Sequence, residues 1–394
     1  MKKVLSLDIK FSLTQILYFG AFCALMGYAS VYLLDKGFTN SIIGIALALV
    51  SAIAVFAQPA LAAFADKNKH IELRRIIEII MVIIVALSLL IYFLKGASLF
   101  LLCIFVAIAT FMTTIQPLFN SIAFSFEKYG IEINFGLARG LGSAAYALVS
   151  LAVGYIVNDL GASILPIIYI VFNILLTIVV HNFVLKNQDQ LEVIETKHEE
   201  SQEQLSFVGF LNKYKWFMVF VLGTVVVFFT HTIINNFFIQ ILTPIGGNES
   251  SMGTAVFLAA IVELPAMGLF NVIRKKVSCT KLLKISVVLF AVKHILIFLA
   301  TNMTMIYIAQ TLQMGAFAIF TPASVYYVNQ IISKNDSVKG QSMVTMGITA
   351  SGILANITGG ILLDAVGVHQ VLLIGGIVSV IGAIIVMFSL EETK

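Results

Sequence analysis

The sequence predicts an all-α membrane protein, with twelve transmembrane helices in two pseudo-symmetric six-helix bundles. Of its 394 residues, 60% are hydrophobic and only 11% are charged, and the mean hydropathy is +1.01. A water-soluble domain has too little interior to hide so much apolar surface. Apolar runs of about 20 residues, the length that crosses about 30 Å of hydrocarbon, recur along the chain. Prolines and a motif with Gly and Asp recur at corresponding positions of the first six and the last six runs.

Twelve apolar runs are long enough to span a bilayer. In order, they lie near residues 11–34, 40–65, 75–94, 97–125, 136–157, 163–185, 214–243, 252–273, 281–300, 304–332, 341–363 and 369–389. The first run is too long for the apolar core of a signal peptide, so we interpret it as a retained span. We therefore expect an N-terminal bundle over residues 1–185, a cytoplasmic linker over 186–213 and a C-terminal bundle over 214–394.

The distribution of cationic residues predicts the orientation of the chain. Twenty of the 24 Lys and Arg residues lie at the termini or in alternate connecting segments, while the intervening loops carry only Lys36 and Lys95. Because cytoplasmic loops carry an excess of Lys and Arg, both termini and the linker should be cytoplasmic. We expect the membrane to be a bacterial inner membrane. Arg139 and Lys293 are then the two cations inside the apolar runs.

Charge and cysteine patterns argue against several other classes of protein. The net charge of +4 comes from short basic clusters rather than from one basic face, so no nucleic-acid partner is indicated. Cys23, Cys103 and Cys279 are widely spaced and suggest neither a disulfide framework nor a metal site. No catalytic motif appears, so we expect neither an enzyme nor a cofactor. The expected partners are the lipid bilayer, a small solute and protons, and the protein is expected to be monomeric.

The two halves of the chain repeat several features. The fifth span of the first half closes on G-Y-I-V-N-D-L-G at 154–161, and that of the second half on G-G-I-L-L-D-A-V-G at 359–367. Prolines recur in the second span of each half, at Pro59 and Pro265, and in the fourth, at Pro117 and Pro322. An even number of spans gives both halves the same orientation. This is the parallel repeat of transporters whose halves rock about a central site.

One arginine lies near the start of the fifth span, in the stretch F-G-L-A-R-G-L-G-S-A-A-Y at 135–146. Placing a cation in hydrocarbon costs about 2.5–3.5 kcal/mol on insertion scales, so Arg139 should face protein, water or a ligand. Tyr146 lies two helical turns further on, on the same face. Gly136, Gly140 and Gly142 should allow a neighbouring helix to approach closely. Alternatively, Arg139 only marks the cytoplasmic end of the span.

Two ionisable residues lie deep in the second half. Glu263, in I-V-E-L-P, is the only acid deep in any span, and an intramembrane carboxylate indicates a functional site by default. Lys293 lies at a similar depth in the ninth span, so the two can pair, either as a proton-coupling device or as a static salt bridge. His294 points about 100° away from Lys293 on a helix, so we expect the lysine to face the cavity.

Other polar residues of the spans are candidates for solute binding. His231 and Asn236 can exchange hydrogen bonds with a hydroxylated ligand, or they can serve as polar contacts between helices. Asn120 and Gln313 carry the same two interpretations. At the cytoplasmic end of the second span, Asp66, Lys67, Arg74 and Arg75 are expected to form a gating clasp rather than part of a substrate site.

Several of these motifs resemble the major facilitator superfamily, in particular lactose permease and the oligosaccharide:proton symporters. Q-P followed by A-D-K at 58–67 is similar to the family's F-Q-P…S-D-K, and 135–146 is similar to its F-G-R-A-R-x-x-G-x-x-G-W. N-F-F at 236–238, T-L-Q-M at 311–314 and G-x-L-L-D-x-x-G at 360–367 extend the likeness into the second half. The resemblance implies the major facilitator fold, with Arg139 as a donor to sugar hydroxyls and Tyr146 as a platform for the sugar ring.

The chain also departs from this family. Asn120 stands where the lactose carriers have a glutamate that pairs with the arginine, so the bidentate sugar clamp is not reproduced. Gln313 stands in place of a tenth-span histidine, and Ala316 in place of the proton-carrying glutamate. The resemblance places Glu263 about one turn from the family's eighth-span glutamate and aligns Lys293 with a ninth-span arginine. Lactose as substrate and the family's proton site are therefore not implied.

We interpret the chain as a secondary active transporter of a small polar or hydroxylated solute, sugar- or nucleoside-like, that works by alternating access with proton symport. The expected solute-binding residues are Asn120, Arg139, Tyr146, His231, Asn236, Glu263 and Gln313. Glu263 and Lys293 are expected to couple protons, and Asp66, Lys67 and Arg75 to gate the cytoplasmic side. The alternative is an exporter of amphipathic or drug-like compounds with the same fold. A transport-dead sensor would be expected to carry a soluble signalling domain.

Overall fold

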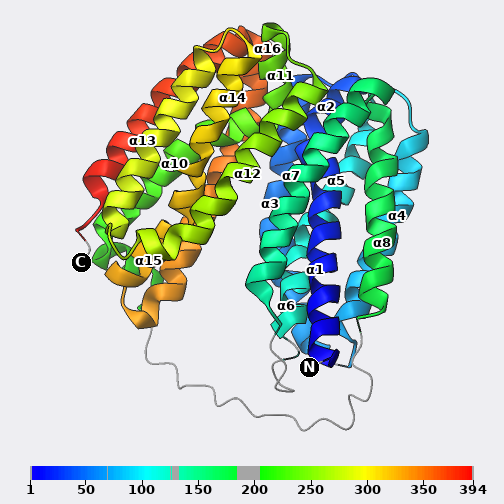
Figure 1. The fold of residues 1–394 in the computed structure, drawn as a ribbon, viewed down its shortest axis with the longest axis horizontal. Coiled ribbons are helices and arrows are strands. Elements are labelled where there is room, and N and C mark those ends of the chain that lie inside the picture. The colour runs from blue at the N-terminus through cyan, green and yellow to red at the C-terminus, as the bar shows by residue number, and fades with distance from the viewer. Residues whose placement is uncertain (1, 69, 125, 127–132, 184–204, 393–394) are drawn as a thin grey trace. The chain divides into compact units, whose positions relative to one another are not determined.

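The computed structural model describes residues 2–68, 70–124, 126, 133–183 and 205–392, and within these ranges every regular element is helical (Figure 1). Ten helices of the described chain are long and apolar enough to cross a membrane. The prediction of an all-α multi-pass membrane protein is therefore confirmed. The ten include one continuous stretch, Lys334–Ser389, where the sequence predicts two spans, and they omit the helix Cys279–Phe298, which carries three lysines.

The chain divides into two compact units. Unit 1 comprises Met1–Phe38 and Leu49–His198, and unit 2 comprises Thr39–Ala48 and Glu199–Lys394. The beginning of the second expected span thus belongs to unit 2. Most of the expected linker lies outside the described residues, and its last part forms the short helix α9, Phe207–Lys213. The division at residues 185 and 214 stays a prediction.

Unit 1 is built from long helices with short interruptions. Its elements are α1 (Lys2–Phe22), the π-helical turn η1 (Cys23–Gly27), α2 (Ala29–Asp35), most of α3 (Asn40–Lys67), α4 (Leu73–Phe93), α5 (Leu99–Thr114), α6 (Gln116–Phe124), α7 (Phe135–Leu160), η3 (Ala162–Ile164) and α8 (Leu165–His181). The first and fourth expected spans are therefore broken helices, interrupted near Cys23 and Ile115.

Unit 2 shows the same kind of interruption. After α9 come α10 (Lys215–Asn236), α11 (Phe238–Leu242), η5 (Thr243–Ile245), α12 (Glu249–Ile273), α13 (Cys279–Phe298), α14 (Met303–Thr311), η6 (Leu312–Met314), α15 (Phe317–Ile331), η7 (Lys334–Asp336) and α16 (Ser337–Ser389). The expected tenth span is again broken, by the short turn η6. Half-helices of this kind are typical of transporters that place polar groups at membrane depth.

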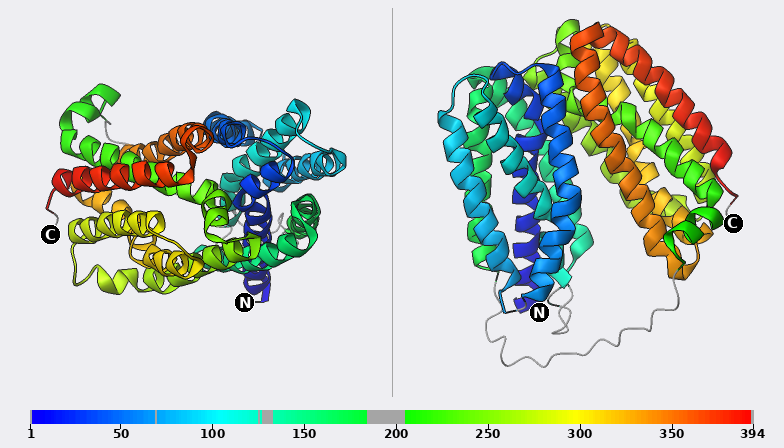
Figure 2. Two further views of the ribbon diagram at one scale, coloured as in Figure 1. Left: turned by 90° about the horizontal axis from the view of Figure 1, so that it is seen from above. Right: turned by 180° about the vertical axis from the view of Figure 1, so that it is seen from behind.

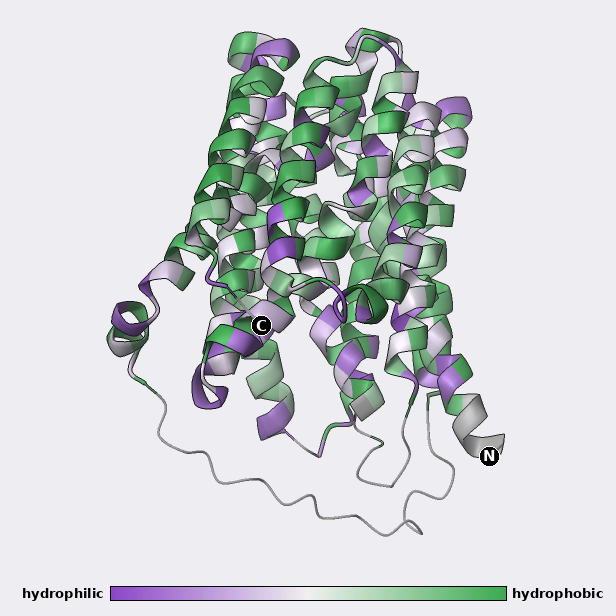
Figure 3. Cartoon of the chain, turned by 60° about the vertical axis from the view of Figure 1, so that its left-hand side comes forward, coloured by the Kyte–Doolittle hydropathy of each residue, from purple (hydrophilic) through white to green (hydrophobic). Residues whose placement is uncertain are grey.

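Local sequence signals explain where the helices begin. Six described helices start with a Ser or Asn whose side chain accepts a hydrogen bond from a backbone N–H of the first turn: Ser98, Asn134, Ser206, Asn248, Ser278 and Asn302. These caps satisfy donors that the helix leaves free. Most of each helix consists of hydrophobic residues, and hydrophilic residues occur at the helix ends and at a few positions along the helices (Figure 3).

The repeated motif of the two halves ends in the same backbone conformation. Gly161 closes α7 at φ 82° and ψ 162°, and Gly367 interrupts α16 at φ 81° and ψ 172°. Glycine reaches this region without the steric cost that a side chain imposes. At Gly367 the chain reverses, so that the two parts of α16 run in opposite directions (Figure 2). The sequence likeness between the halves therefore has a structural counterpart.

The carboxylate of Asp364, in the motif at 359–367, caps the start of α3. Asp364 accepts hydrogen bonds from the backbone N–H groups of Asn40 and Ser41, at 3.2 and 2.7 Å, and from their side chains, at 2.8 and 2.6 Å. An anion at this position satisfies free donors and complements the positive end of the helix dipole. Within unit 2, α3 therefore begins on a carboxylate that α16 supplies.

Close glycine packing occurs mainly between α10 and α16. A Cβ on Gly382 would lie 2.8 Å from the backbone N of Val227, and a Cβ on Gly223 would lie 3.0 Å from that of Val386. In α7, the expectation holds for Gly142, where a Cβ would meet Phe19 at 2.6 Å. It is not met at Gly136 and Gly140, because no atom of another described helix lies within 4 Å of a Cβ there. Spacing alone does not tell which face of a helix a neighbour approaches.

This packing predicts a contrast between two glycines of α16. Gly382→Ala should lower the stability of the purified protein by about 1–3 kcal/mol, the usual cost of overpacking. Gly352→Ala is the matched control, because no described atom lies within 4 Å of a Cβ there. It should be neutral or slightly stabilising, since Ala favours helix by about 1 kcal/mol. Thermal unfolding in detergent measures both, and equal melting temperatures would show that the α10–α16 approach is not tight.

Candidate functional site

The candidate residues lie in both units. In unit 1, Arg139 occupies the second turn of α7 and is half-buried. Its guanidinium carbon lies 4.1 Å from the centre of the Phe19 ring of α1, and Nη1 donates to Ser143 Oγ at 3.3 Å. A guanidinium over an aromatic face is stabilised by cation–π attraction. The cation therefore has a protein partner, while the rest of its donor fork remains for a ligand or water.

Tyr146 and Asn120 are the other unit 1 candidates, and both are half-buried. The Tyr146 hydroxyl approaches η1 so closely that a Cβ on Gly27 would lie 2.8 Å from it. The aromatic ring beneath Arg139 is that of Phe19 rather than Tyr146. Sequence reasoning missed Phe19, because one phenylalanine among 31 carries no signal of its own.

In unit 2, three candidates form a continuous polar connection. The Lys293 side chain of α13 is only 1% exposed, and its Nζ donates to Gln313 Oε1 at 2.5 Å. The Glu263 carboxyl group of α12 interacts electrostatically with Gln313, in the turn η6, and with the Lys293 ammonium group. No direct ion pair joins Lys293 to Glu263 among the described residues. Gln313 is therefore the link between the buried cation and the acid.

Two buried imidazoles lie next to this connection. The rings of His231 on α10 and His294 on α13 are 6.0 Å apart at an interplanar angle of 29°. His294 Nδ1 lies 2.8 Å from Ser379 Oγ, and His231 Nε2 lies 3.0 Å from Asn235 Nδ2. Lys293 and His294 thus reach different neighbours, as the 100° step between adjacent helical residues requires. Both are nevertheless buried, which the sequence argument did not foresee for His294.

A pair of amide side chains adds to the buried and half-buried polar groups of unit 2. Asn236, at the end of α10, donates from Nδ2 to Asn356 Oδ1 at 2.6 Å. Asn356 lies on α16 and is 2% exposed. Sequence reasoning missed it, although an asparagine within an apolar run is the kind of signal that could have identified it. Paired amides of this kind can exchange hydrogen bonds with hydroxyl groups of a solute.

The expected gating clasp lies on the surface of unit 1. Asp66, Lys67 and Arg75 are exposed, at the end of α3 and the start of α4. Arg74 makes the tighter contacts here, with the Glu72 carboxylate and with the His181 carbonyl oxygen at 2.9 Å. The Arg74 guanidinium holds the pKa of Glu72 below its usual range. A gating role for Asp66, Lys67 and Arg75 stays a prediction.

Ammonium, carboxyl, imidazole and amide groups all lie within the long apolar helices of this chain. Such groups are expensive in a membrane and mark pathways for solutes or ions. No cluster of three metal-ligating side chains occurs in the part of the chain that the structure describes. The fold and these groups are those of a membrane transporter of the major facilitator type.

The chain belongs to the MFS_1 like family, whose profile matches residues 9–374. It is 25% identical over 289 residues to the uncharacterized transporter YwbF of Bacillus subtilis (strain 168), covering 73% of this chain and 69% of that protein. Among solved structures, the nucleoside transporter NupG superposes with a TM-score of 0.78 at 17% identity, over 98% of this chain and 100% of NupG. These relatives are transporters, in agreement with a protein that is not an enzyme.

A second structure supports the same fold. A bacterial homolog of the human lysosomal transporter Spinster, in an inward-facing and unoccupied conformation, matches with a TM-score of 0.72 at 14% identity, over 98% of this chain and 96% of that one. At such identities, the structural likeness shows the fold alone. The likeness to lactose permease that the motifs suggest is not specifically supported by these comparisons.

The Lys293–Gln313 contact yields a prediction about stability. Gln313→Leu removes the acceptor of a buried ammonium and should destabilise the protein by about 1–3 kcal/mol. Lys293→Met combined with Gln313→Leu should recover part of this loss, because no buried charge then lacks a partner. Gln310→Leu is the control, since no described group is bonded to Gln310 Oε1. Chemical unfolding of the two single variants and the double variant measures how strongly the two changes are coupled. If the losses of stability simply add, the contact is contradicted.

Proposed function

We propose that this protein is a secondary active transporter that moves a small polar or hydroxylated solute, sugar- or nucleoside-like, by alternating access and proton symport. The observation that carries the proposal is the buried connection from Lys293 through Gln313 to Glu263. The nucleoside transporter NupG, which shares the fold, supports a solute of this size and polarity.

The connection suggests how a proton and a solute could move together. When Glu263 is ionised, its negative charge balances that of Lys293 through the intervening amide. When Glu263 takes up a proton, Gln313 no longer has a carboxylate to hold and can rotate its amide towards a solute hydroxyl. A carboxyl and an ammonium that share one amide therefore respond to protonation as a unit. Solute binding and proton uptake on unit 2 would then favour each other.

Unit 1 supplies the second set of solute contacts in this proposal. Arg139 keeps free donors beside the Phe19 ring, and Tyr146 and Asn120 add a ring and an amide. His231 and Asn236 are the further unit 2 contacts. Asp66, Lys67 and Arg75 gate the cytoplasmic side.

The proposal includes the membrane arrangement. The chain crosses a bacterial inner membrane twelve times as a monomer, with two six-helix bundles over 1–185 and 214–394 and both termini in the cytoplasm. Counting α13 and the two parts of α16 separately gives twelve spans, because Gly367 divides α16. We also propose that it is related to the oligosaccharide:proton symporters, on the strength of the motifs at 135–146 and 360–367.

Glu263→Gln tests the proton-coupling step. The variant should lose accumulation of solute against a gradient, because its amide cannot carry a proton, while exchange of labelled solute across the membrane should continue. Glu249→Gln is the control on the same helix, in its first turn. Reconstituted vesicles loaded with candidate nucleosides and sugars would show both activities. Unchanged pH-dependent accumulation in Glu263→Gln would remove this residue from the mechanism.

Arg139→Lys tests the solute contact of unit 1. A lysine keeps the charge but cannot provide the planar fork or the same stacking on Phe19, so binding should weaken by about tenfold, or roughly 1.4 kcal/mol. Thermal-shift titration of the purified variant with the solute measures the affinity. Full retention of affinity would favour the alternative that Arg139 only fixes the orientation of the span.

A further inference from the structure

The short helix α9 lies where the chain of unit 2 enters the membrane. The candidate span α10 begins at Lys215, two residues after α9 ends. Between the two helices, Tyr214 has φ −109° and ψ 49°, so the chain turns there instead of continuing as one helix. Trp216, the only tryptophan of the chain, lies in the first turn of α10 and is 60% exposed. Because tryptophan is enriched at membrane–water interfaces, α9 lies next to that interface.

Contacts at both ends fix α9 on unit 2. The backbone N of Leu205 donates to Asp336 Oδ1 at 3.2 Å, and Lys339 Nζ donates to the Leu205 carbonyl oxygen. At the other end, the Tyr214 hydroxyl accepts a hydrogen bond from the backbone N of Ser333 at 3.2 Å. These contacts fix which face of α9 is turned towards unit 2 and which is turned away from it.

One side of α9 is apolar, and protein covers only part of it. At about 100° per residue, Phe210, Phe207, Leu211 and Val208 follow one another around an arc of about 160°. Phe210 is fully buried in the hydrophobic core of unit 2, whereas Phe207 is 56% and Val208 65% exposed. A short amphipathic helix with an exposed apolar side, directly before a span, is typical of helices that lie in the membrane interface.

Exposed lysines lie near this apolar side. Lys213 ends α9, Lys215 begins α10, and Lys334 lies in η7, next to the residue that hydrogen-bonds Tyr214. None of these three lysines takes part in the ion pairs of the described residues. The nearby Asp336 carboxylate is 2% exposed and already bonded within unit 2. The name α9 surface is used below for Phe207, Val208, Lys213, Lys215 and Trp216.

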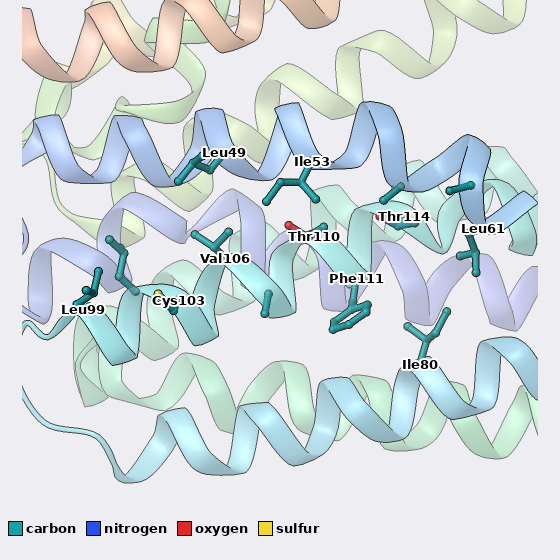
Figure 4. A pocket seen from close by; sticks show the side chains of 14 residues that line it. Leu49, Ile53, Leu61, Ile80, Leu99, Cys103, Val106, Thr110, Phe111 and Thr114 are labelled. Carbon is teal, nitrogen blue, oxygen red and sulfur yellow. The ribbon is translucent and has the colours of Figure 1, made fainter.

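The exposed apolar surface of unit 1 differs from the α9 surface. A groove of about 660 Å³ between α3, α4 and α5 is lined by 14 residues, and none of them is charged (Figure 4). The acyl chains of neutral and anionic phospholipids are alike, so a wall of this kind gives no reason to prefer one headgroup. The α9 surface combines exposed apolar side chains with exposed lysines and can therefore select lipids by charge.

We propose that the α9 surface binds anionic phospholipids of the leaflet that faces the linker. Phe207 and Val208 lie below the headgroups, among the first carbons of the acyl chains. The Lys213 and Lys215 ammonium groups lie at the level of the headgroup phosphates and attract their negative charge. The contacts of Leu205 and Tyr214 keep the surface in this orientation. Lipid binding here is independent of the transported solute and of proton coupling.

Trp216 reports directly on the lipids next to α9, because the chain has no other tryptophan. The full chain is reconstituted into mixed vesicles in which either an anionic phosphatidylglycerol or a neutral phosphatidylcholine carries bromine on its acyl chains, which quenches tryptophan fluorescence on contact. At equal mole fraction, the brominated phosphatidylglycerol should quench Trp216 several-fold more efficiently, and salt should reduce the difference. Equal quenching by the two lipids would overturn the proposal.

Charge variants show whether the lysines of the α9 surface cause this preference. Lys213→Gln combined with Lys215→Gln should abolish it. Lys275→Gln combined with Lys276→Gln is the matched control, because it removes the same charge from two exposed residues between α12 and α13. The control should keep the preference of the unmodified protein. If the first pair of changes leaves the preference intact, the α9 surface does not select the lipid and the proposal fails.

A second readout tests the apolar side of α9. Phe207→Trp combined with Trp216→Phe moves the only tryptophan to this side. Its fluorescence should be quenched by phospholipids brominated near the start of the acyl chain and protected from iodide in the water. Asn212→Trp in the same background is the control, because Asn212 is exposed on the polar side and should respond to iodide. Quenching by iodide at position 207 would show that this face meets water, and protection from both quenchers would show that protein covers it. Either result would overturn the proposal.

Discussion

The arrangement of polar groups in unit 2 depends on how the buried ammonium group of Lys293 is stabilised. Lys293 is 1% exposed on a helix of an apolar unit, where an unpaired charge is very costly. Its partner is not an acid in direct contact but the Gln313 amide, which connects it to Glu263. The turn η6 interrupts the expected tenth span at this position and places Gln313 next to α13. A broken helix, a buried cation and a half-buried acid are therefore parts of one arrangement.

The repeated architecture supports that arrangement. Gly161 and Gly367 end corresponding segments with nearly the same φ and ψ, and helices are interrupted in both units. In unit 2, glycines let α10 and α16 approach so closely that backbone atoms of one helix would contact a Cβ on the other. Small residues allow such packing in a membrane, where apolar attraction between helices is absent. Asp364, in the same repeated motif, holds the start of α3.

The sequence predicted much of the fold, because the apolar runs and cations are direct consequences of the membrane environment. A charge in an apolar run is conspicuous, so the sequence also singled out Glu263, Lys293 and Arg139 as candidates, whose roles stay predictions. It did not identify Phe19 beneath Arg139, Asn356 beside Asn236 or the capping role of Asp364. These depend on which helices meet in three dimensions. The same reason applies to Gly136 and Gly140, where no described helix of unit 1 packs against the glycine.

The central claim is that protonation and solute binding meet at the Lys293–Gln313–Glu263 connection. The most direct test is proton movement in reconstituted vesicles that contain a trapped pH-sensitive dye, recorded after uridine, lactose or related solutes are added outside. The account predicts that addition of one of these solutes acidifies the lumen of vesicles that contain the unmodified protein. If the solute enters these vesicles and their internal pH does not change, the account is contradicted.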